Sequence, residues 1–113
     1  MGNKYGAQKI KDPATGYVFD SKKEFIRWCE LRIMERSGVI SDLKRQVKYV
    51  LIPAQRDNIG KIVEKECSYY ADFEYVDLKG IKVVEDCKGY KTDAYKIKKK
   101  LMLWVHGIRI KET

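Results

Sequence analysis

The chain has 113 residues, of which 24 are Lys or Arg and 16 are Asp or Glu, so its formal charge at pH 7 is +8. A chain of this length is expected to form one domain, residues 1–113, and so large a positive charge on it favours a polyanionic partner such as nucleic acid. No apolar run is long enough for a signal peptide or a membrane span, and the three cysteines show no metal-ligand spacing, which excludes a membrane protein and a disulfide or zinc scaffold and indicates a cytoplasmic protein.

The first regular element expected is a helix from Ser21 to about Ser37. Residues 1–11 before it are polar, and we expect them to be loose. Within the helix, apolar residues recur at helical spacing, and Gly38 follows where such a helix would end. The members of this stripe are Phe25, Trp28, Cys29, Leu31, Ile33 and Met34.

Three strands are expected after this helix. An apolar, β-branched run from Val47 to Ile52 forms the first, and turn residues follow it at 56–60. The stretch from Ile62 to Val76 is rich in Tyr, Val and Phe and alternates in its second half, which indicates a long second strand. Leu78-Lys79-Gly80 suits a three-residue hairpin loop, so the chain returns as a third strand through Ile81 to Lys88.

A second helix and a short last strand complete the chain. Thr92 suits the helix N-cap, and the helix is expected to stop before Gly107. Its apolar stripe consists of Ala94, Ile97, Leu101, Trp104 and Val105. Residues 108–111 alternate as a strand. The order helix, three strands, helix, strand predicts an α/β (α+β) fold with a mixed sheet flanked by helices.

Two aspartates are expected to converge on the second and third strands. With residues 78–80 as the loop, Asp77 pairs with Ile81, and counting back places Asp72 across from Asp86, about 5 Å away at the backbone. Two adjacent carboxylates repel each other and raise the pKa of one of them, a cost that a purely structural site has little reason to bear.

A divalent cation would remove that repulsion. Mg²⁺ takes oxygen ligands, often one or two carboxylates, and keeps other positions for water and a substrate phosphate; Mn²⁺ could replace it. Lys88 shares a strand face with Asp86 and could orient the attacking water or neutralise charge on the phosphate. Two alternatives remain open. The charges could be solvated residues of an amphipathic hairpin, or a two-residue turn could make Glu85 the metal ligand, because a one-residue slip reverses side-chain direction.

These motifs resemble the PD-(D/E)xK, or restriction-endonuclease-like, nucleases, whose core runs helix, three strands, helix, strand. Ala71-Asp72 looks like their first motif, with Ala in place of the usual Pro, and Asp86-Cys87-Lys88 looks like the second. The nearer resemblance, over nearly the whole chain, is to small phage proteins of this superfamily. It rests on Phe19-Asp20-Ser21-Lys22-Lys23-Glu24, Ser41-Asp42-Leu43, Tyr70-Ala71-Asp72-Phe73 and Asp86-Cys87-Lys88-Gly89.

The resemblance extends to two further positions. In the related Holliday-junction resolvases a glutamate of the first helix joins the metal site, and Glu24 is the residue that matches. Glu24 also completes a capping box with Ser21, in which it would only return a hydrogen bond to the Ser21 amide. Gln46, just before the first expected strand, matches a position that is usually Gln in the phage proteins and could support the site.

Basic residues at the start of the second helix are candidates for DNA contacts. A helix N-terminus and lysines along one side could grip the DNA backbone, or they could form an ordinary solvated helix face. The candidates are Lys91, Thr92, Lys96, Lys99 and Lys100.

The resemblance implies a Mg²⁺-dependent DNA endonuclease that leaves 5′-phosphate and 3′-hydroxyl ends, works as a homodimer and needs no small-molecule cofactor. A chain this short has little surface for reading base edges, so cleavage of branched recombination or replication intermediates is favoured over sequence-specific restriction. The alternative from another class is a basic DNA-binding accessory protein that keeps the nuclease fold without cutting.

Overall fold

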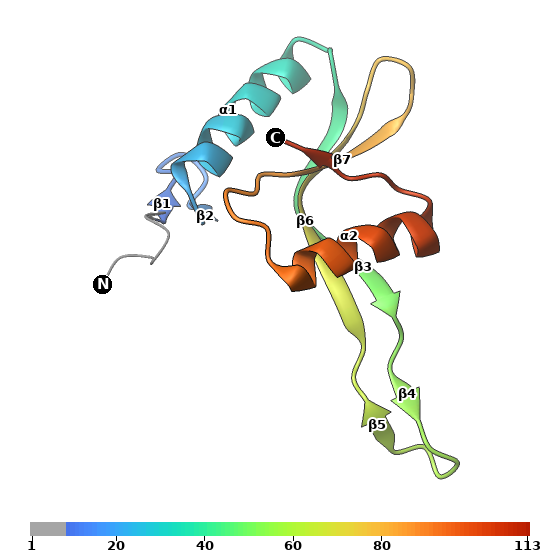
Figure 1. Cartoon of the computed structure of the whole chain (residues 1–113). Coiled ribbons are helices and arrows are strands. Elements are labelled where there is room, and N and C mark those ends of the chain that lie inside the picture. Colours follow the sequence, from blue (N-terminus) through green and yellow to red (C-terminus); the bar gives the residue numbers. More distant parts are fainter. Residues whose placement is uncertain (1–8) are drawn as a thin grey trace. The chain divides into compact units, whose positions relative to one another are not determined.

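The structure, a computed structural model, describes residues 9–113 (Figure 1). Neither helix of this range is long and apolar enough to cross a membrane. The elements are, in chain order, β1 (Ile10–Lys11), β2 (Val18–Phe19), α1 (Lys22–Arg36), β3 (Ser41–Ile52), β4 (Gln55–Arg56), β5 (Ile62–Glu64), β6 (Cys67–Val76), β7 (Lys82–Asp86), α2 (Asp93–His106) and β8 (Lys111–Glu112).

The chain forms two compact units, each built from separate stretches of sequence. The first unit contains the described residues up to Leu43 together with Tyr75–Val83, and the second contains Lys44–Glu74 and Val84–Thr113. The first unit therefore holds β1, β2, α1 and the β6–β7 turn, whereas the second holds α2, β8 and most of the sheet.

In the first unit, α1 begins and ends where the sequence indicates. The Ser21 side chain accepts a hydrogen bond from the Glu24 amide, and Gly38, with a φ of 81°, follows the helix end. Phe19 and Trp28 pack with their ring centroids 6.0 Å apart, which joins β2 to the helix. Neither β1 nor its antiparallel partner β2 was predicted. Residues 1–11 were expected to be loose, and of these only residues 9–11 are described.

The expected apolar stripe of α1 is correct only in part. Trp28 and Leu31 are buried, but Ile33 is 64% exposed and Cys29 is also exposed. Apolar residues of α1 lie on more than one side of the helix, so their spacing alone could not indicate which side packs against the rest of the protein.

The central sheet has four strands in the order β3-β6-β7-β8. The β6–β7 turn closes as predicted, because the Asp77 amide donates to the Ile81 carbonyl at 2.9 Å. β8 pairs in parallel with β7, matching Glu85 with Lys111 and Asp86 with Glu112. A hairpin connection combined with a parallel crossover through α2 makes the sheet mixed, so the α/β class is confirmed.

The strands differ from the expected ones in three places, the last of which is β8, found at Lys111–Glu112 instead of at residues 108–111. β3 starts at Ser41, six residues before the expected Val47, because it includes a polar stretch that carries no strand signal in the sequence. The expected long strand from Ile62 is interrupted after Glu64. Its first part, β5, pairs with β4 as a two-stranded arm that projects beyond the sheet (Figure 1).

The core of the second unit lies between α2 and the sheet. Tyr95 and Met102 of α2 pack with buried residues of β3, β6, β7 and the C-terminal segment, namely Leu51, Tyr69, Ala71, Val84 and Ile110. The predicted stripe of α2 is therefore wrong in part, because Ile97 is 58% exposed and Trp104 is 85% exposed. The helix has apolar residues on two sides, and the sheet covers the side that carries Tyr95 and Met102.

The difference between these two sides of α2 predicts a difference in stability. Met102 is fully buried, so Met102→Ala should lower the free energy of unfolding by about 3 kcal/mol through lost burial and an unfilled cavity. Trp104→Ala on the same helix should change it by less than about 0.5 kcal/mol. Urea denaturation of the two variants measures both values, and equal losses would contradict this packing.

Candidate functional site

The two aspartates of the predicted site lie together in the second unit. Asp72, in the middle of β6, accepts a hydrogen bond at Oδ2 from the Cys87 amide, and Cys87 directly follows β7 (2.8 Å). The Asp72 carboxylate lies close to that of Asp86, and its negative charge raises the pKa of Asp86. The convergence expected from the hairpin register is therefore present in the structure.

Asp86 lies in a confined, polar environment. Its side chain is fully buried, and the Tyr69 hydroxyl donates to Oδ2 at 2.5 Å. Its other oxygen, Oδ1, is also buried and accepts no hydrogen bond from the described residues, while the Lys88 ammonium lies 3.7 Å away. Burial, followed by the negative charge of Asp72, raises the pKa of Asp86 to about 6, although Tyr69 and Lys88 oppose this rise.

This arrangement is suited to a hard divalent cation. A buried carboxylate oxygen without a hydrogen-bond donor, next to a second carboxylate, offers oxygen ligands whose mutual repulsion a cation would remove. No three His, Cys, Asp or Glu side chains of residues 9–113 group closely enough to enclose a metal on their own. A divalent cation at this place would have Asp72 and Asp86 as its carboxylate ligands and would need water molecules in its other positions.

The Lys88 ammonium is placed by two neighbours. It lies 3.7 Å from Asp86 Oδ1 and 5.1 Å from the ring centroid of Tyr95 on α2. The Tyr95 ring is buried and therefore fixed in place, and the cation–π contact attracts the Lys88 ammonium to it modestly. The result is a positive charge beside the two carboxylates.

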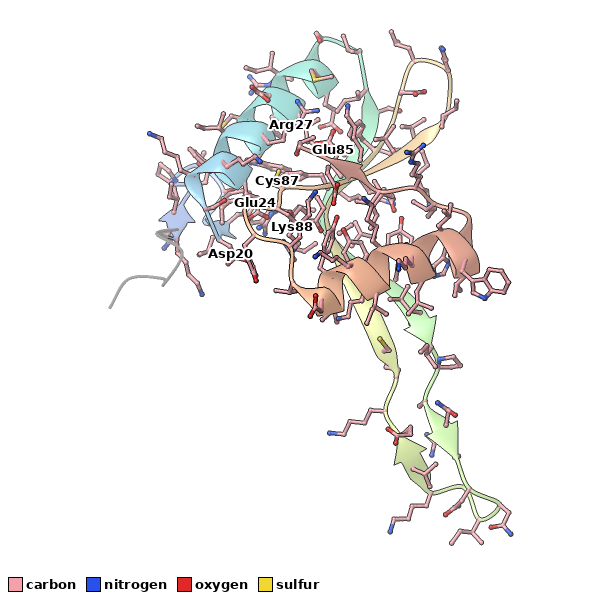
Figure 2. The ribbon with its side chains drawn as sticks, in the orientation of Figure 1. Asp20, Glu24, Arg27, Glu85, Cys87 and Lys88 are labelled. Carbon is pink, nitrogen blue, oxygen red and sulfur yellow. The ribbon has the colours of Figure 1, made fainter. Side chains whose placement is uncertain are left out.

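The structure bears on the choice between Asp86 and Glu85. Successive side chains of a strand point to opposite faces, so Glu85 projects away from the side of β7 that carries Asp86. Glu85 is fully buried, and Figure 2 labels it at the end of β7, followed by Cys87 and Lys88. The carboxyl group that lies beside Asp72 is that of Asp86.

Glu24 and Gln46 occupy other surroundings. Glu24 belongs to the first unit, where Figure 2 labels it on α1, and its buried carboxylate accepts a hydrogen bond from the Asp20 amide (3.0 Å). The capping box is thus present, but its return bond goes to Asp20 instead of the expected Ser21. Gln46 lies within β3 instead of before it, is exposed, and has a φ of 53°, which is unusual for a residue in a strand.

The four lysines and one threonine predicted to contact DNA divide into three groups. Lys91 and Lys99 both bind Glu112 Oε1 of β8, each at 3.1 Å. Thr92 caps α2, because its hydroxyl accepts from the Tyr95 amide. The remaining candidates, Lys96 and Lys100, are exposed on α2.

Three side chains of this region were not anticipated as part of the site. Strand alternation places Tyr69 on the face of β6 opposite Asp72, yet its hydroxyl donates to Asp86. Tyr95 donates to Glu112 Oε2 at 2.8 Å, and this bond together with Lys91 and Lys99 lowers the pKa of Glu112 to about 2. No pattern of residue types signals these contacts, since they depend on the docking of α2 and β8 in three dimensions.

Comparison with known proteins gives one match. No curated protein and no solved structure matches the chain. A family model described as "Protein of unknown function (DUF1064)" matches residues 2–109, a span that includes both aspartates, Lys88 and all of α2. Because this match covers nearly the whole sequence, the chain belongs to the DUF1064 family.

Proposed function

We propose that this protein is a Mg²⁺-dependent DNA endonuclease with a restriction-endonuclease-like core. One observation carries the proposal: the buried Asp86 Oδ1, which accepts no hydrogen bond from the described residues, lies beside the Asp72 carboxylate and 3.7 Å from the Lys88 ammonium. Two carboxylates and one lysine are the groups needed to bind a cation and a phosphate at one place. The charge of +8 supports a polyanionic substrate.

The reaction proposed is hydrolysis of a phosphodiester bond. The oxygen of a water molecule attacks phosphorus, the bond from phosphorus to the 3′ oxygen breaks, and that oxygen takes up a proton, leaving 5′-phosphate and 3′-hydroxyl ends. A bound Mg²⁺ would supply a more acidic water and neutralise phosphate charge.

The protein's own groups would orient the reactants. Asp72 and Asp86 supply the ligands, and the Cys87 amide and Tyr69 hydroxyl fix the orientation of these carboxylates. Lys88 supplies a positive charge where negative charge develops on the phosphate.

The substrate we propose is branched DNA, and the working form a homodimer that serves two strands. The rival candidate, a DNA-binding accessory protein without activity, is favoured by the basic surface but leaves the paired carboxylates unexplained. Light scattering of the purified protein would test the dimer independently of activity.

The test of this function is incubation of the protein with linear, forked and four-way-junction DNA, with 10 mM Mg²⁺ or with EDTA. We expect cleavage only with Mg²⁺, and the products should carry 5′-phosphates that a ligase can join. Salt-sensitive binding that is the same with and without metal, and no cleavage of any substrate, would favour the accessory protein.

The role of Glu24 as a further ligand remains a prediction from the resemblance, and one substitution separates it from capping. Glu24→Gln keeps a side-chain oxygen that can accept from the Asp20 amide, so the stability of α1 should change by less than about 1 kcal/mol. If Glu24 binds the metal, cleavage should fall at least tenfold while the melting temperature stays the same. Unchanged cleavage would leave Glu24 as a cap only.

A further inference from the structure

A pocket of about 410 Å³ opens in the second unit between α2 and the C-terminal segment. Its apolar lining comes from Tyr95, Leu103 and Ile110, and its basic lining includes Lys96, Lys100 and Arg109. A pocket of this volume is large enough for a small organic ligand such as one nucleotide.

The basic lining of this pocket is only partly neutralised. Lys91 and Lys99, which also line it, share the Glu112 carboxylate as ion-pair partner. Lys96, Lys100 and Arg109 are exposed and make no ion pair with any other residue of the described range 9–113. Three such cations around one cavity raise the local affinity for an anion, and a phosphate is the anion that they fit.

A phosphate alone would not need the apolar part of this pocket. Tyr95 and Ile110 are almost fully buried and form its floor, whereas Leu103 is 54% exposed and lies at its side. A flat, weakly polar group such as a nucleobase fits this surface, as bases do when they lie on apolar or aromatic side chains. Together the floor and the cations suit a nucleotide.

Tyr95 connects this pocket with the candidate metal site. Its ring contacts the Lys88 ammonium and its hydroxyl binds Glu112, so one side chain lies between the two. We propose that the pocket receives one unpaired nucleotide of the DNA, next to the phosphate that is cleaved. The inference rests on the proposed function in taking DNA as the ligand, and it names the class of substrate: DNA with a nucleotide outside the duplex.

The proposal explains how a short chain would prefer branched DNA. A base in a duplex is paired and stacked, so it can reach the floor only after unpairing, which costs a few kcal/mol. At a fork or junction this cost is already met, and the nucleotide enters without it. We therefore expect a forked DNA to bind about tenfold more tightly than a blunt duplex of the same length.

The test measures binding in EDTA, where no cleavage occurs. Fluorescence anisotropy compares a blunt duplex with the same duplex carrying an unpaired arm, using the full chain and two variants. Leu103→Glu places a carboxylate on the pocket wall, whereas Val105→Glu, on the same helix and also exposed, adds the same charge outside the lining. We expect Leu103→Glu to abolish the preference for the forked DNA. Val105→Glu should weaken the binding of both DNAs equally and keep the preference.

Three results would overturn the inference. The first is equal binding of fork and duplex by the wild type, and the second is loss of the preference in both variants. The third is that free thymidine monophosphate competes with DNA while the wild type shows no preference for the fork, which would mean that the pocket binds a free nucleotide. The outcomes are separate from those of the cleavage test. A protein that cleaves without preferring the fork would disprove only the pocket, and one that prefers the fork but never cleaves would disprove only the nuclease.

Discussion

Asp86→Asn is expected to abolish cleavage and at the same time to make the metal-free protein more stable above pH 6. Loss of one of two carboxylate ligands removes several kcal/mol of transition-state stabilisation, so cleavage should fall about 10³-fold or more. The stability gain has a different origin, because the wild-type protein buries a carboxylate without a cation to compensate it.

The pH dependence of this gain follows from the pKa of Asp86. Folding raises that pKa from the ordinary 3.8 to about 6, chiefly through burial, so between these values the folded protein holds a proton that the unfolded chain releases. The free energy of unfolding should therefore fall as the pH rises from about 4 to 6, by up to about 3 kcal/mol, and stay lower above it. Asn carries no charge, so the free energy of unfolding of the variant should not fall over this pH range.

Thermal unfolding in EDTA at several pH values measures the effect. At pH 7.5 the variant should melt about 5 °C or more above the wild type, and the two should converge near pH 4. Glu64→Gln, which removes a carboxylate from the exposed arm, should leave the pH profile unchanged. A lower melting temperature for Asp86→Asn at pH 7.5 would mean that the carboxylate is satisfied in the fold and not in need of a cation.

Lys88→Met is expected to reduce cleavage by about 10²- to 10³-fold without weakening metal binding. The Lys88 ammonium lies 3.7 Å from Asp86 Oδ1, so its removal makes the electrostatic potential at the two carboxylates more negative. The variant should therefore bind a cation at least as tightly as the wild type. This split between activity and metal affinity distinguishes a group that acts on the phosphate from one that merely balances charge in the fold.

Single-turnover cleavage and metal titration of the same samples check this prediction. Lys61→Met on the arm, which removes the same charge outside the site, should cleave like the wild type. Lys88→Arg keeps the positive charge and should recover part of the activity. Full activity of Lys88→Met would exclude Lys88 from the reaction.

The sequence predicts the fold well where local signals are strong. Ser21 and Gly38 mark the ends of α1, Thr92 and Gly107 mark those of α2, and the turn at 78–80 sets the pairing of Asp77 with Ile81. It fails where packing decides. The covered side of α2 carries Met102 instead of Trp104, because only the shape of the sheet selects between two apolar sides.

The candidate site shows the same division. The sequence predicted that Asp72 lies beside Asp86 by counting along a hairpin whose turn chemistry is visible, and the two carboxyl groups do lie together. The contacts of Tyr69 with Asp86 and of Tyr95 with Glu112 could not be predicted, because they join segments that approach only after the helix and the last strand have docked.

Binding of Mn²⁺ tests the central claim most directly, because it needs no knowledge of the DNA substrate. Titration of the wild type, Asp72→Asn and Asp86→Asn can be followed by the electron paramagnetic resonance signal of free Mn²⁺. We predict one site with millimolar or tighter affinity in the wild type and its loss in both variants, with Mg²⁺ competing for it. The same Mn²⁺ binding in all three proteins, or none in the wild type, would contradict a metal centre at this carboxylate pair.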